Sequence, residues 1–396
     1  MKKVLIGSFD MEVGGVERSL ISMLDNFDYD NHEVDLMLYS HTGDFIPLLN
    51  NKVNLLKEDR KYSTFRKSIV EIFKQGNILL GSSRILARIF ANLKGKINKI
   101  NEYGVYQMQL MWKYALPFLP KIEKEYDIAI SYLWPHYFIA EKVKARKKIA
   151  WIHTDYSTIE TDVNLDLKMW DKFDHIIAVS EECKNAFLIK YPTLNEKIRV
   201  IENITSPEFI KKMAKENIEE IWEENSFKIL SVARLSHAKG IDRAVKALKV
   251  LHERGLTNIK WYVVGYGGDE EIIRKLIEEN NLQESFILLG KKVNPYPYMK
   301  RCDLYVQPSR YEGKAVTVGE AQILGKPVII TNYTTAKSQV KEDFDGYICD
   351  STIEGIADGI EKLFGDKALR DKLSCNCKKS DYRNSNELNK LYDLIK

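Results

Sequence analysis

Residues 303–331 read DLYVQPSRYEGKAVTVGEAQILGKPVIIT and contain the pattern that decides the fold. The runs 303–308 and 326–331 are short, apolar and β-rich, as in strands that are buried on both faces. The stretch 309–316 predicts a loop, and the residues from Thr317 to the position before Gly325 predict a helix. A strand, a helix and a second strand in this order predict two parallel strands with the helix packed on their sheet.

The same alternation of β-rich runs and helical patterns extends through both halves of the chain. In the first half the predicted strands are 3–8, 33–39, 126–131, 147–152, 174–180 and 196–201. In the second half they are 228–234, 260–265, 285–290, 303–308, 326–331 and 346–349. This pattern predicts an α/β protein with two Rossmann-like, doubly wound parallel sheets, whose domains face each other across a cleft.

The length of 396 residues is too great for one ordinary domain and favours two. Between the predicted strands 196–201 and 228–234 lies a highly charged stretch, in which Pro207 breaks the continuity of any regular element. We therefore place the domain boundary there, with a first domain over 1–204 and a second over 205–380.

Composition excludes several classes of protein. Hydrophobic residues make up 44% and charged residues 29% of the chain, and no apolar run approaches the roughly 18 residues that a membrane span needs. We expect neither a span nor an export signal. The net charge of +4 is too small to indicate a nucleic-acid partner. Five cysteines without a C-x-x-C pair favour a reducing cytoplasm over disulfides or zinc.

Two glutamates flank the start of the helix that follows the strand 303–308. The N-terminus of such a helix offers free N–H groups and partial positive charge, which suit a phosphate. Glu312 precedes this point and Glu320 follows it, so the layout suits a nucleotide sugar, with hydroxyls on both sides of a diphosphate. Gly313 lets the backbone approach a ligand closely. The alternative for Thr317 and Glu320 is a capping box, because TVGE fits its pattern.

Two cations follow the predicted strand 228–234. Arg234 ends this strand, and Lys239 stands just before Gly240 and a helical pattern. At a strand's carboxyl end, two cations can neutralise a diphosphate and stabilise it as a leaving group. The alternative is that both side chains are merely solvated.

The first half offers a glycine pair and a histidine at strand ends. Gly14 and Gly15 separate the first strand from the next helix, so the backbone can come close to a ligand. His153 ends the strand 147–152 and could hydrogen-bond a substrate hydroxyl, although a lone histidine is as often structural. His136 is a weaker candidate.

Other catalytic patterns are missing from the sequence. The glycines do not form G-x-G-x-x-G, and there is no Walker loop, G-x-S-x-G or H-E-x-x-H. No D-x-D follows a strand of the first half in the manner of motifs that hold a divalent cation beside a nucleotide sugar. We expect chemistry without a cofactor or a metal.

Positive charge is concentrated in one segment. From Ile72 to Asn101 there is no Asp or Glu, but there are Lys74, Arg84, Arg88, Lys94, Lys96 and Lys99. Apolar residues recur at helical spacing opposite these cations, namely Ile85, Leu86, Ile89, Phe90, Leu93, Ile97 and Ile100. The helix over 82–101 either packs this stripe on its own domain or lies on anionic lipid together with the basic segment 142–148.

Taken together, these residues resemble the retaining glycosyltransferases of family 4, also called group 1 glycosyltransferases, which have the B-type glycosyltransferase fold. The most specific match is PSRYEGKAVTVGEAQILGKPVII against the family pattern PSxxEGFGxxxxEAxAxGxPVI, which pairs Glu312 with Glu320. Arg234, Lys239, the glycine pair and His153 match further motifs in the family's order. The resemblance covers nearly the whole chain.

The resemblance implies a role for each site residue. The first domain would bind the acceptor, the second would bind the nucleotide sugar, and the helix at 381–396 would cross back to the first domain. Glu312 and the backbone amides that follow it, from Gly313 through Lys314, Ala315 and Val316 to Thr317, would hold the donor sugar. Glu320 would bind the ribose, Arg234 and Lys239 the diphosphate, and His153 the sugar hydroxyls, with Gly14 and Gly15 close to the donor.

The implied reaction moves a hexose or N-acetylhexosamine from a nucleoside diphosphate donor, for which we expect uridine diphosphate, to a cell-surface polysaccharide, a lipid-linked glycan or a wall polymer. Lys314 and Ala315 replace the family's usual Phe-Gly, so we expect an acidic or phosphate-bearing partner near Lys314. The implied location is the cytoplasm or the inner face of the plasma membrane. An epimerase of the same fold and a non-catalytic protein that binds sugar nucleotides are the alternatives.

Overall fold

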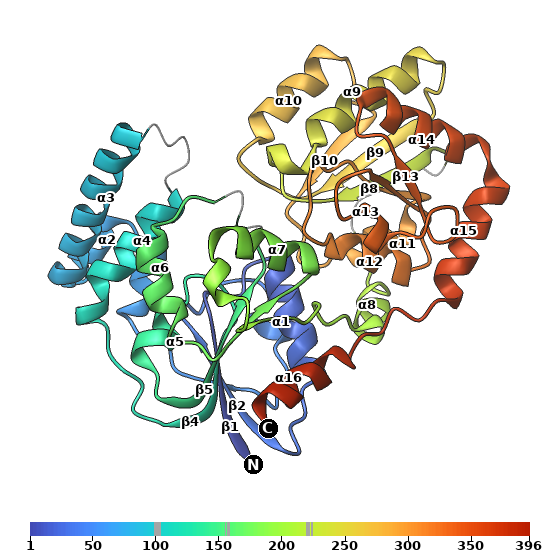
Figure 1. Cartoon of the computed structure of the whole chain (residues 1–396). Helices are drawn as coiled ribbons and strands as arrows, with labels where there is room; N and C mark the ends of the chain where they lie inside the picture. The colour runs from blue at the N-terminus through green and yellow to red at the C-terminus, as the bar shows by residue number, and fades with distance from the viewer. Residues whose placement is uncertain (99–103, 155, 157–158, 219–221, 223–224) are drawn as a thin grey trace. The chain divides into compact units, whose positions relative to one another are not determined.

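The computed structural model describes residues 1–98, 104–154, 156, 159–218, 222 and 225–396, with the side chains of 94–98 left out (Figure 1). Contacts within the chain divide it into two compact units. Unit 1 contains Met1–Ile204 and Asn384–Lys396, and unit 2 contains Thr205–Arg383. The division falls at the predicted residue 204, while the last segment of unit 1 begins three residues after the predicted 381.

Unit 1 is built on a seven-stranded sheet in the order β3-β2-β1-β4-β5-β6-β7, and every neighbouring pair is parallel. The strands are β1 Lys2–Ser8, β2 His32–Leu38, β3 Asn54–Leu55, β4 Tyr126–Ser131, β5 Ala145–Ile152, β6 His175–Ala178 and β7 Ile198–Val200. All six predicted strands are present. The two-residue edge strand β3 was missed, because it is too short to show a pattern.

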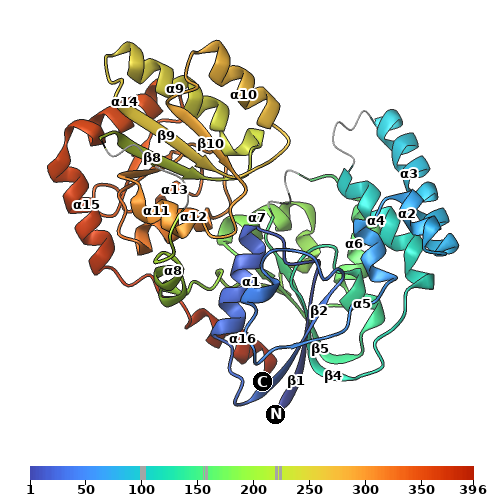
Figure 2. The same cartoon turned by 180° about the vertical axis from the view of Figure 1, so that it is seen from behind.

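Helices lie on both faces of this sheet, as Figures 1 and 2 show. The α-helices of unit 1 are α1 Gly15–Asp25, α2 Ile69–Lys74, α3 Ile78–Asn98, α4 Gly104–Ala115, α5 Tyr137–Lys142, α6 Val163–Trp170, α7 Glu181–Lys190 and α16 Glu387–Ile395. Its short 3-10 helices are η1 Ile46–Leu48, η2 Tyr62–Arg66, η3 Leu116–Phe118 and η5 Pro192–Leu194.

Unit 2 contains a six-stranded parallel sheet in the order β10-β9-β8-β11-β12-β13. Its strands are β8 Phe227–Val232, β9 Ile259–Val264, β10 Phe286–Gly290, β11 Leu304–Gln307, β12 Val328–Thr331 and β13 Tyr347–Cys349. Its helices are α8 Pro207–Met213, η6 His237–Lys239, α9 Ile241–Glu253, α10 Glu270–Glu279, α11 Tyr296–Arg301, α12 Val316–Ile323, α13 Ala336–Gln339, α14 Ile353–Gly365 and α15 Lys367–Lys379. All six predicted strands are present here too.

Alternate residues of these strands enter two separate cores. Trp261 and Val263 of β9 belong to one hydrophobic cluster, whereas Tyr262 and Val264 belong to another. Because successive side chains of a strand point to opposite faces, helices must cover both faces of the sheet. The predicted doubly wound architecture of two parallel-sheet domains is confirmed.

The strand orders place a topological switch point in each sheet. In unit 2 the chain runs from β8 outward to β10, then returns to lay β11 on the other side of β8. In unit 1 the same reversal occurs between β1 and β4. Open parallel sheets bind ligands beyond the carboxyl ends of the strands at such points. The loops after β8, β11, β1 and β4 are therefore where functional side chains are expected.

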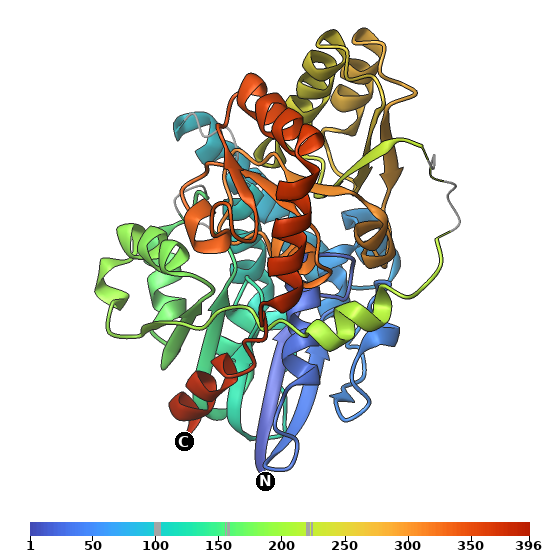
Figure 3. The ribbon, with the colours of Figure 1, turned by 90° about the vertical axis from the view of Figure 1, so that its right-hand side faces the viewer.

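The C-terminal helix α16 packs in unit 1. Leu388, Leu391 and Ile395 are buried in the core of that unit. Lys2 Nζ donates a hydrogen bond of 2.7 Å to the carbonyl oxygen of Ile395. The two chain ends consequently lie at the same end of the sheet of unit 1, as Figure 3 shows.

Two expectations need correction. Pro207 does not simply break the chain: it is the first residue of α8, with Ser206 as the N-cap, a position that tolerates proline because the missing N–H has no helical partner there. In the helix over 82–101, found as part of α3, the apolar stripe packs on unit 1 only in part, with the ring centroid of Phe90 6.1 Å from that of Tyr114 of α4. Ile85, Leu86, Ile89, Phe90 and Leu93 are 41–52% exposed. Ile97, Ile100 and the lysines at 94, 96 and 99 lie outside the described side chains.

All five cysteines are free thiols. Among the helices of the described residues, none is both long enough and apolar enough to cross a membrane.

Candidate functional site

Lys239 and Glu312 meet at the switch point of unit 2. Lys239 Nζ lies 2.7 Å from Oε1 and 2.6 Å from Oε2 of Glu312. Lys239 follows β8 and Glu312 follows β11, which are neighbours in the sheet. The side chain of Glu312 is only 6% exposed, whereas that of Lys239 is 28% exposed. Both predicted residues thus lie in one site, and they form an ion pair that the sequence did not predict.

Gly240 brings the two loops together. Its backbone is left-handed, with φ of 66°, and a Cβ at this residue would collide with the carbonyl oxygen of Pro308. Glycine alone avoids both the strain and the collision. Arg310 N also donates a 2.8 Å hydrogen bond to the carbonyl oxygen of Ala238, so the loop after β11 is attached directly to η6.

Three further contacts hold Glu312 in place. Ser309 Oγ donates a hydrogen bond of 2.7 Å to Glu312 Oε1, and Gln307 Nε2 lies 3.2 Å from the same oxygen. Thr335 Oγ1 donates to the backbone carbonyl of Glu312 at 3.1 Å. These partners were not predicted. A signal existed for Gln307, since a buried amide at the end of an apolar strand needs a polar partner.

The loop leads into α12, which begins at Val316. The helix N-cap is Ala315, with no side-chain hydrogen bond to the helix. Thr317 lies inside the helix and its hydroxyl is 3.4 Å from Gln307 Oε1. The capping-box alternative for Thr317 and Glu320 is therefore wrong, and no side chain caps the first N–H groups of α12. The preceding residues Gly313 and Lys314 are half-buried.

Glu320 lies one turn into α12 and is 2% exposed. Tyr296 Oη donates a hydrogen bond of 2.8 Å to Glu320 Oε1. Tyr296 begins α11, whose helix packs near α12. A buried carboxylate held by a phenol has a fixed orientation, which is what a residue that binds a ribose requires. Tyr296 was not predicted.

Arg234 behaves differently from Lys239. It is exposed and makes no ion pair or hydrogen bond with the described part of the chain. The neighbouring cation Arg310 instead forms a bidentate pair with Asp242, with distances of 2.7 and 2.6 Å. Because Arg310 is neutralised by Asp242, Arg234 is the cation of this edge that has its charge available for a ligand.

His153 follows β5 in unit 1. Within the described residues, neither of its buried ring nitrogens has a hydrogen-bond partner. Burial lowers the pKa of His153 to about 3, and the nearby backbone of Tyr132 offsets this only in part. The imidazole is therefore neutral at physiological pH, and among the described residues neither nitrogen has a partner with good hydrogen-bond geometry. An unsatisfied buried polar group is costly, and a ligand hydroxyl would relieve that cost.

His136 has a structural environment. It is fully buried, its Nδ1 lies 2.8 Å from Ser131 Oγ, and its ring contacts Trp170. Burial, aided by the proximity of His153, lowers the pKa of His136 to about 3.

Gly14 and Gly15 begin α1 after β1. Gly14 is the N-cap in an extended conformation, with no side-chain hydrogen bond to the helix. A Cβ at Gly15 would meet nothing within 4 Å. Neither backbone strain nor internal packing explains a glycine at residue 15. These glycines and His153 lie at the carboxyl end of the sheet of unit 1.

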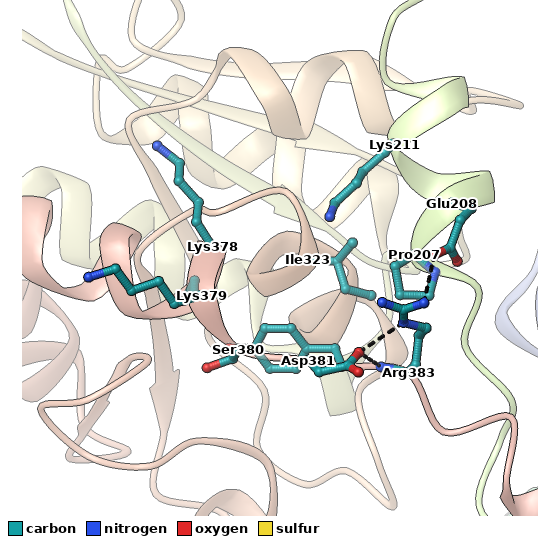
Figure 4. A pocket seen from close by; sticks show the side chains of 11 residues that line it. Pro207, Glu208, Lys211, Ile323, Lys378, Lys379, Ser380, Asp381 and Arg383 are labelled. Carbon is teal, nitrogen blue, oxygen red and sulfur yellow. Dashed lines mark hydrogen bonds and ion pairs between the residues drawn. The ribbon is translucent and has the colours of Figure 1, made fainter.

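A separate pocket in unit 2 lies away from this site (Figure 4). Its volume is about 240 Å³ and its lining includes Lys211, Ile323 and Arg383. Ile323 ends α12, so the pocket is roughly 12 Å from the helix N-terminus at 1.5 Å per residue. Arg383 is neutralised by Asp381 and Glu208, at 3.1 and 3.4 Å. Besides Lys211, the lining also includes Lys378 and Lys379. In the described residues, no group of three or more His, Cys, Asp or Glu could hold a metal ion.

Comparison with known proteins finds a family match for the second unit of the chain. Residues 213–380 match the family described as glycosyl transferases group 1. Over 221 residues the chain is 29% identical to the capsular polysaccharide biosynthesis glycosyltransferase CapM of Staphylococcus aureus, covering 52% of this chain and 56% of CapM. Over 159 residues it is 30% identical to an Escherichia coli enzyme named UDP-Gal:α-D-GlcNAc-diphosphoundecaprenol α-1,3-galactosyltransferase, covering 39% and 40% of the two chains. The chain thus spans less than two thirds of the length of these relatives.

Solved structures share the fold. The crystal structure of S. aureus TarM, in complex with fondaparinux, α-GlcNAc-glycerol and UDP, matches with a TM-score of 0.68 at 16% identity, over 100% of both chains. The predicted B-type glycosyltransferase fold is confirmed by this likeness. The matched residues 213–380 include Arg234, Lys239, Glu312 and Glu320, so the site described above lies within the family's own region. The family match is thus to residues 213–380, which are similar to the glycosyl transferases group 1.

Proposed function

We propose that the protein is a retaining glycosyltransferase that moves a hexose or N-acetylhexosamine from a nucleoside diphosphate sugar, UDP-linked, to a surface polysaccharide, a lipid-linked glycan or a wall polymer. The observation that carries this proposal is the contact between Lys239 and Glu312 at the switch point of unit 2. It holds a carboxylate next to a cation beside the uncapped start of α12, an arrangement that supports binding of sugar hydroxyls and phosphate.

Charge complementarity supports a diphosphate at this edge. Arg234 is exposed without a partner in the described chain, and the first N–H groups of α12 point beyond the same edge of the sheet. Helix N-termini and arginines stabilise phosphate oxygens, and more so as a leaving group gains charge. We assign the diphosphate to Arg234, Lys239 and this helix start, and the ribose to Glu320.

The reaction follows from that placement. The bond between the anomeric carbon and the diphosphate oxygen breaks, and a bond forms between that carbon and the acceptor oxygen on the same face of the sugar. The departing phosphate oxygen takes the acceptor's proton, so the anomeric configuration is retained without a protein nucleophile. Neutral His153 would accept a hydrogen bond from a hydroxyl of the donor sugar or donate one to it. This role stays a prediction. We propose that protein cations replace a metal in this step.

The comparisons support the donor and acceptor classes. TarM was solved with UDP, the E. coli relative is named for UDP-Gal and a diphosphoundecaprenol acceptor, and CapM for capsular polysaccharide. The five free thiols are compatible with the proposed cytoplasmic location.

A donor panel tests this function. Purified protein is incubated in chelator with uridine, guanosine and adenosine diphosphate sugars, and the released nucleotide is measured. We expect slow release from one uridine donor, lost in Glu312→Gln and kept in the control Glu361→Gln, which changes an exposed glutamate of another ion pair. NMR of the product should then show the donor's anomeric configuration.

Two results would contradict the proposal. A sugar with altered stereochemistry away from the anomeric carbon, and no glycosidic bond, would favour the epimerase alternative. Unaltered donor after long incubation with glycan, lipid-linked and polymer acceptors would favour a protein that only binds sugar nucleotides.

A further inference from the structure

Helices α2 and α3 of unit 1 expose an unusual number of large apolar side chains. Of the sixteen exposed large hydrophobic residues in the described chain, nine lie between Val70 and Leu93. Their exposure ranges from 36% at Phe73 to 64% at Ile78. Exposed apolar residues are normal when scattered singly, but a cluster marks an interaction site.

The inward face of α3 is already satisfied without these residues. The buried positions of the helix carry Leu80, Ser83, Arg84, Ala87 and Ala91, which recur three or four residues apart. This face packs against α4, where Arg84 Nη1 lies 3.7 Å from Met111 Sδ. The helix therefore turns Leu80, Arg84 and three small residues inward and leaves most of its large apolar residues exposed, unlike an ordinary surface helix.

The outward face forms one continuous apolar band. At roughly 100° per residue, Ile78, Leu79, Ile85, Leu86, Ile89, Phe90 and Leu93 fall within an arc of about 140°. No charged residue of the described side chains falls inside this arc, which also includes the exposed Ser82, and Arg88 lies about 60° beyond its edge. In Figures 1 and 2, α3 is the outermost helix of unit 1, on the far side of α4 from the sheet.

The charge around the band indicates the partner. From Ile72 to Asn101 the sequence has six cations and no carboxylate. Of the three whose side chains are described, Lys74 and Arg88 are exposed, while Arg84 is buried on the inward face. The nearest acid, Glu71, is already engaged in a capping box with Ser68. A second copy of the chain is a poor partner, since a two-fold interface would bring the cations of both copies together with no carboxylate to neutralise them. An anionic surface neutralises them directly.

We propose that the outward face of α2 and α3 docks the protein on an anionic lipid bilayer, with the apolar band among the acyl chains and the flanking cations at the phosphates. A convex band of long aliphatic side chains suits the soft boundary of a bilayer better than the shaped groove of a protein. This inference goes beyond the proposed function and does not depend on it, because the face contains none of the site residues.

The basic segment 142–148 does not belong to this face. Lys144 pairs with Glu125 at 3.2 Å and Arg146 with Asp127 at 3.4 Å. Lys147 Nζ donates to the carbonyl oxygen of Leu394 at 2.8 Å, and Lys148 Nζ to that of Ala140 at 3.0 Å. Four of its five charges are engaged within unit 1, so we leave this segment out of the docking surface that the sequence suggested.

Co-sedimentation with lipid vesicles tests the proposal. Full-length protein is mixed with vesicles of phosphatidylcholine alone or with phosphatidylglycerol, at low and high salt. The double variant Leu86→Asn/Ile89→Asn makes the band polar without a change of charge, and Arg88→Gln removes a flanking cation. The control Ile189→Asn/Ile272→Asn changes two isoleucines that are 80% and 60% exposed elsewhere.

We expect binding to the anionic vesicles alone, weakened at least tenfold in Leu86→Asn/Ile89→Asn, weakened by salt and by Arg88→Gln, and unchanged in the control. Donor hydrolysis in solution should be the same in all variants. No binding of the parent, or equal binding of the parent and the double variant, would overturn the proposal. A dimer in sedimentation equilibrium that the double variant dissociates, without vesicle binding, would assign the face to a second copy instead.

Discussion

The Nζ atom of Lys239 lies within 2.7 Å of both carboxylate oxygens of Glu312, although 73 residues separate the two in the chain. The contact joins the loop after β8 to the loop after β11, the two central strands of the sheet of unit 2. It also makes each residue dependent on the other. A cation that holds a diphosphate would at the same time hold the carboxylate that binds the sugar.

The variant Lys239→Met tests this dependence. The nearly buried carboxylate of Glu312 would lose its cation and keep only the hydrogen bonds from Ser309 and Gln307. We expect unit 2 to lose about 1–3 kcal/mol of unfolding free energy, the cost of an under-satisfied buried group. Urea unfolding of Lys239→Met, Glu312→Gln and the double variant measures it. Strictly additive losses would show that the contact contributes nothing.

Loss of the Glu312 carboxylate should affect turnover more strongly than it affects stability. If Glu312 orients the donor sugar, Glu312→Gln should lower kcat by about 100-fold or more, in the range found when a group aligned with a transition state is removed. Steady-state kinetics with the donor found in the panel checks this. A variant that keeps kcat and loses only stability would place Glu312 in the scaffold and not in the site.

Gly240 and Gly15 form a matched pair of glycines. Gly240→Ala should cost at least about 1–2 kcal/mol, because the left-handed conformation penalises a Cβ and Pro308 leaves no room for one. Gly15→Ala should leave stability unchanged or raise it by up to about 1 kcal/mol, since alanine favours helices and nothing lies within 4 Å of the added carbon.

Activity separates the roles of these glycines. If a ligand approaches the backbone at residue 15, Gly15→Ala should raise KM or lower kcat in spite of its intact stability. Thermal unfolding and donor kinetics of both variants give the answer. Full activity of Gly15→Ala would refute a ligand contact there.

How far the sequence could predict this molecule depends on the distance between the residues involved. Strands such as β11 and β12 were predicted because a buried strand is a local pattern of apolar residues. The contact of Lys239 with Glu312 could not be predicted, because it requires β8 and β11 to be neighbours. No local pattern of residues states the order of strands in a sheet. The hydrogen bond from Tyr296 to Glu320 was missed for the same reason. In α3 the apolar period was recognised, but the period alone does not say which face is turned inward.

The pH dependence of stability should reveal His136. Its folded-state pKa of about 3 is below the ordinary 6.5, so the unfolded chain binds a proton more readily. The native state is therefore favoured above pH 6.5, and its free energy of unfolding falls as the pH drops from about 6.5 towards 3. This one group contributes a loss of up to about 1.4 kcal/mol per pH unit.

The variant His136→Gln removes this proton linkage. We expect it to be less stable than the parent at pH 7, because Ser131 loses its partner, but to show a shallower loss of stability between pH 6.5 and 4. Urea unfolding at pH 7, 6, 5 and 4 provides the comparison. Parallel curves for the two proteins would mean that His136 is protonated in the folded state.

Tyr296→Phe tests the second glutamate. It removes the phenol that donates to Glu320 Oε1 and leaves the ring in the core. We expect a loss of about 1–3 kcal/mol in stability and weaker binding of the nucleotide, because Glu320 loses its fixed orientation. Tyr298→Phe is the control for a neighbouring phenol of the same helix. Equal nucleotide affinity in Tyr296→Phe and the parent would separate Glu320 from the ligand.

The most direct test of the central claim is a calorimetric titration of UDP, in chelator, into the parent and into Arg234→Gln, Glu320→Gln and the control Glu361→Gln. This measurement needs no knowledge of the sugar or the acceptor. The account predicts that the parent and the control bind UDP alike, and that Arg234→Gln and Glu320→Gln each bind it at least tenfold more weakly while remaining folded. Unchanged affinity in both site variants, or no affinity of the parent for UDP, would contradict a UDP-sugar site at the ends of β8 and β11.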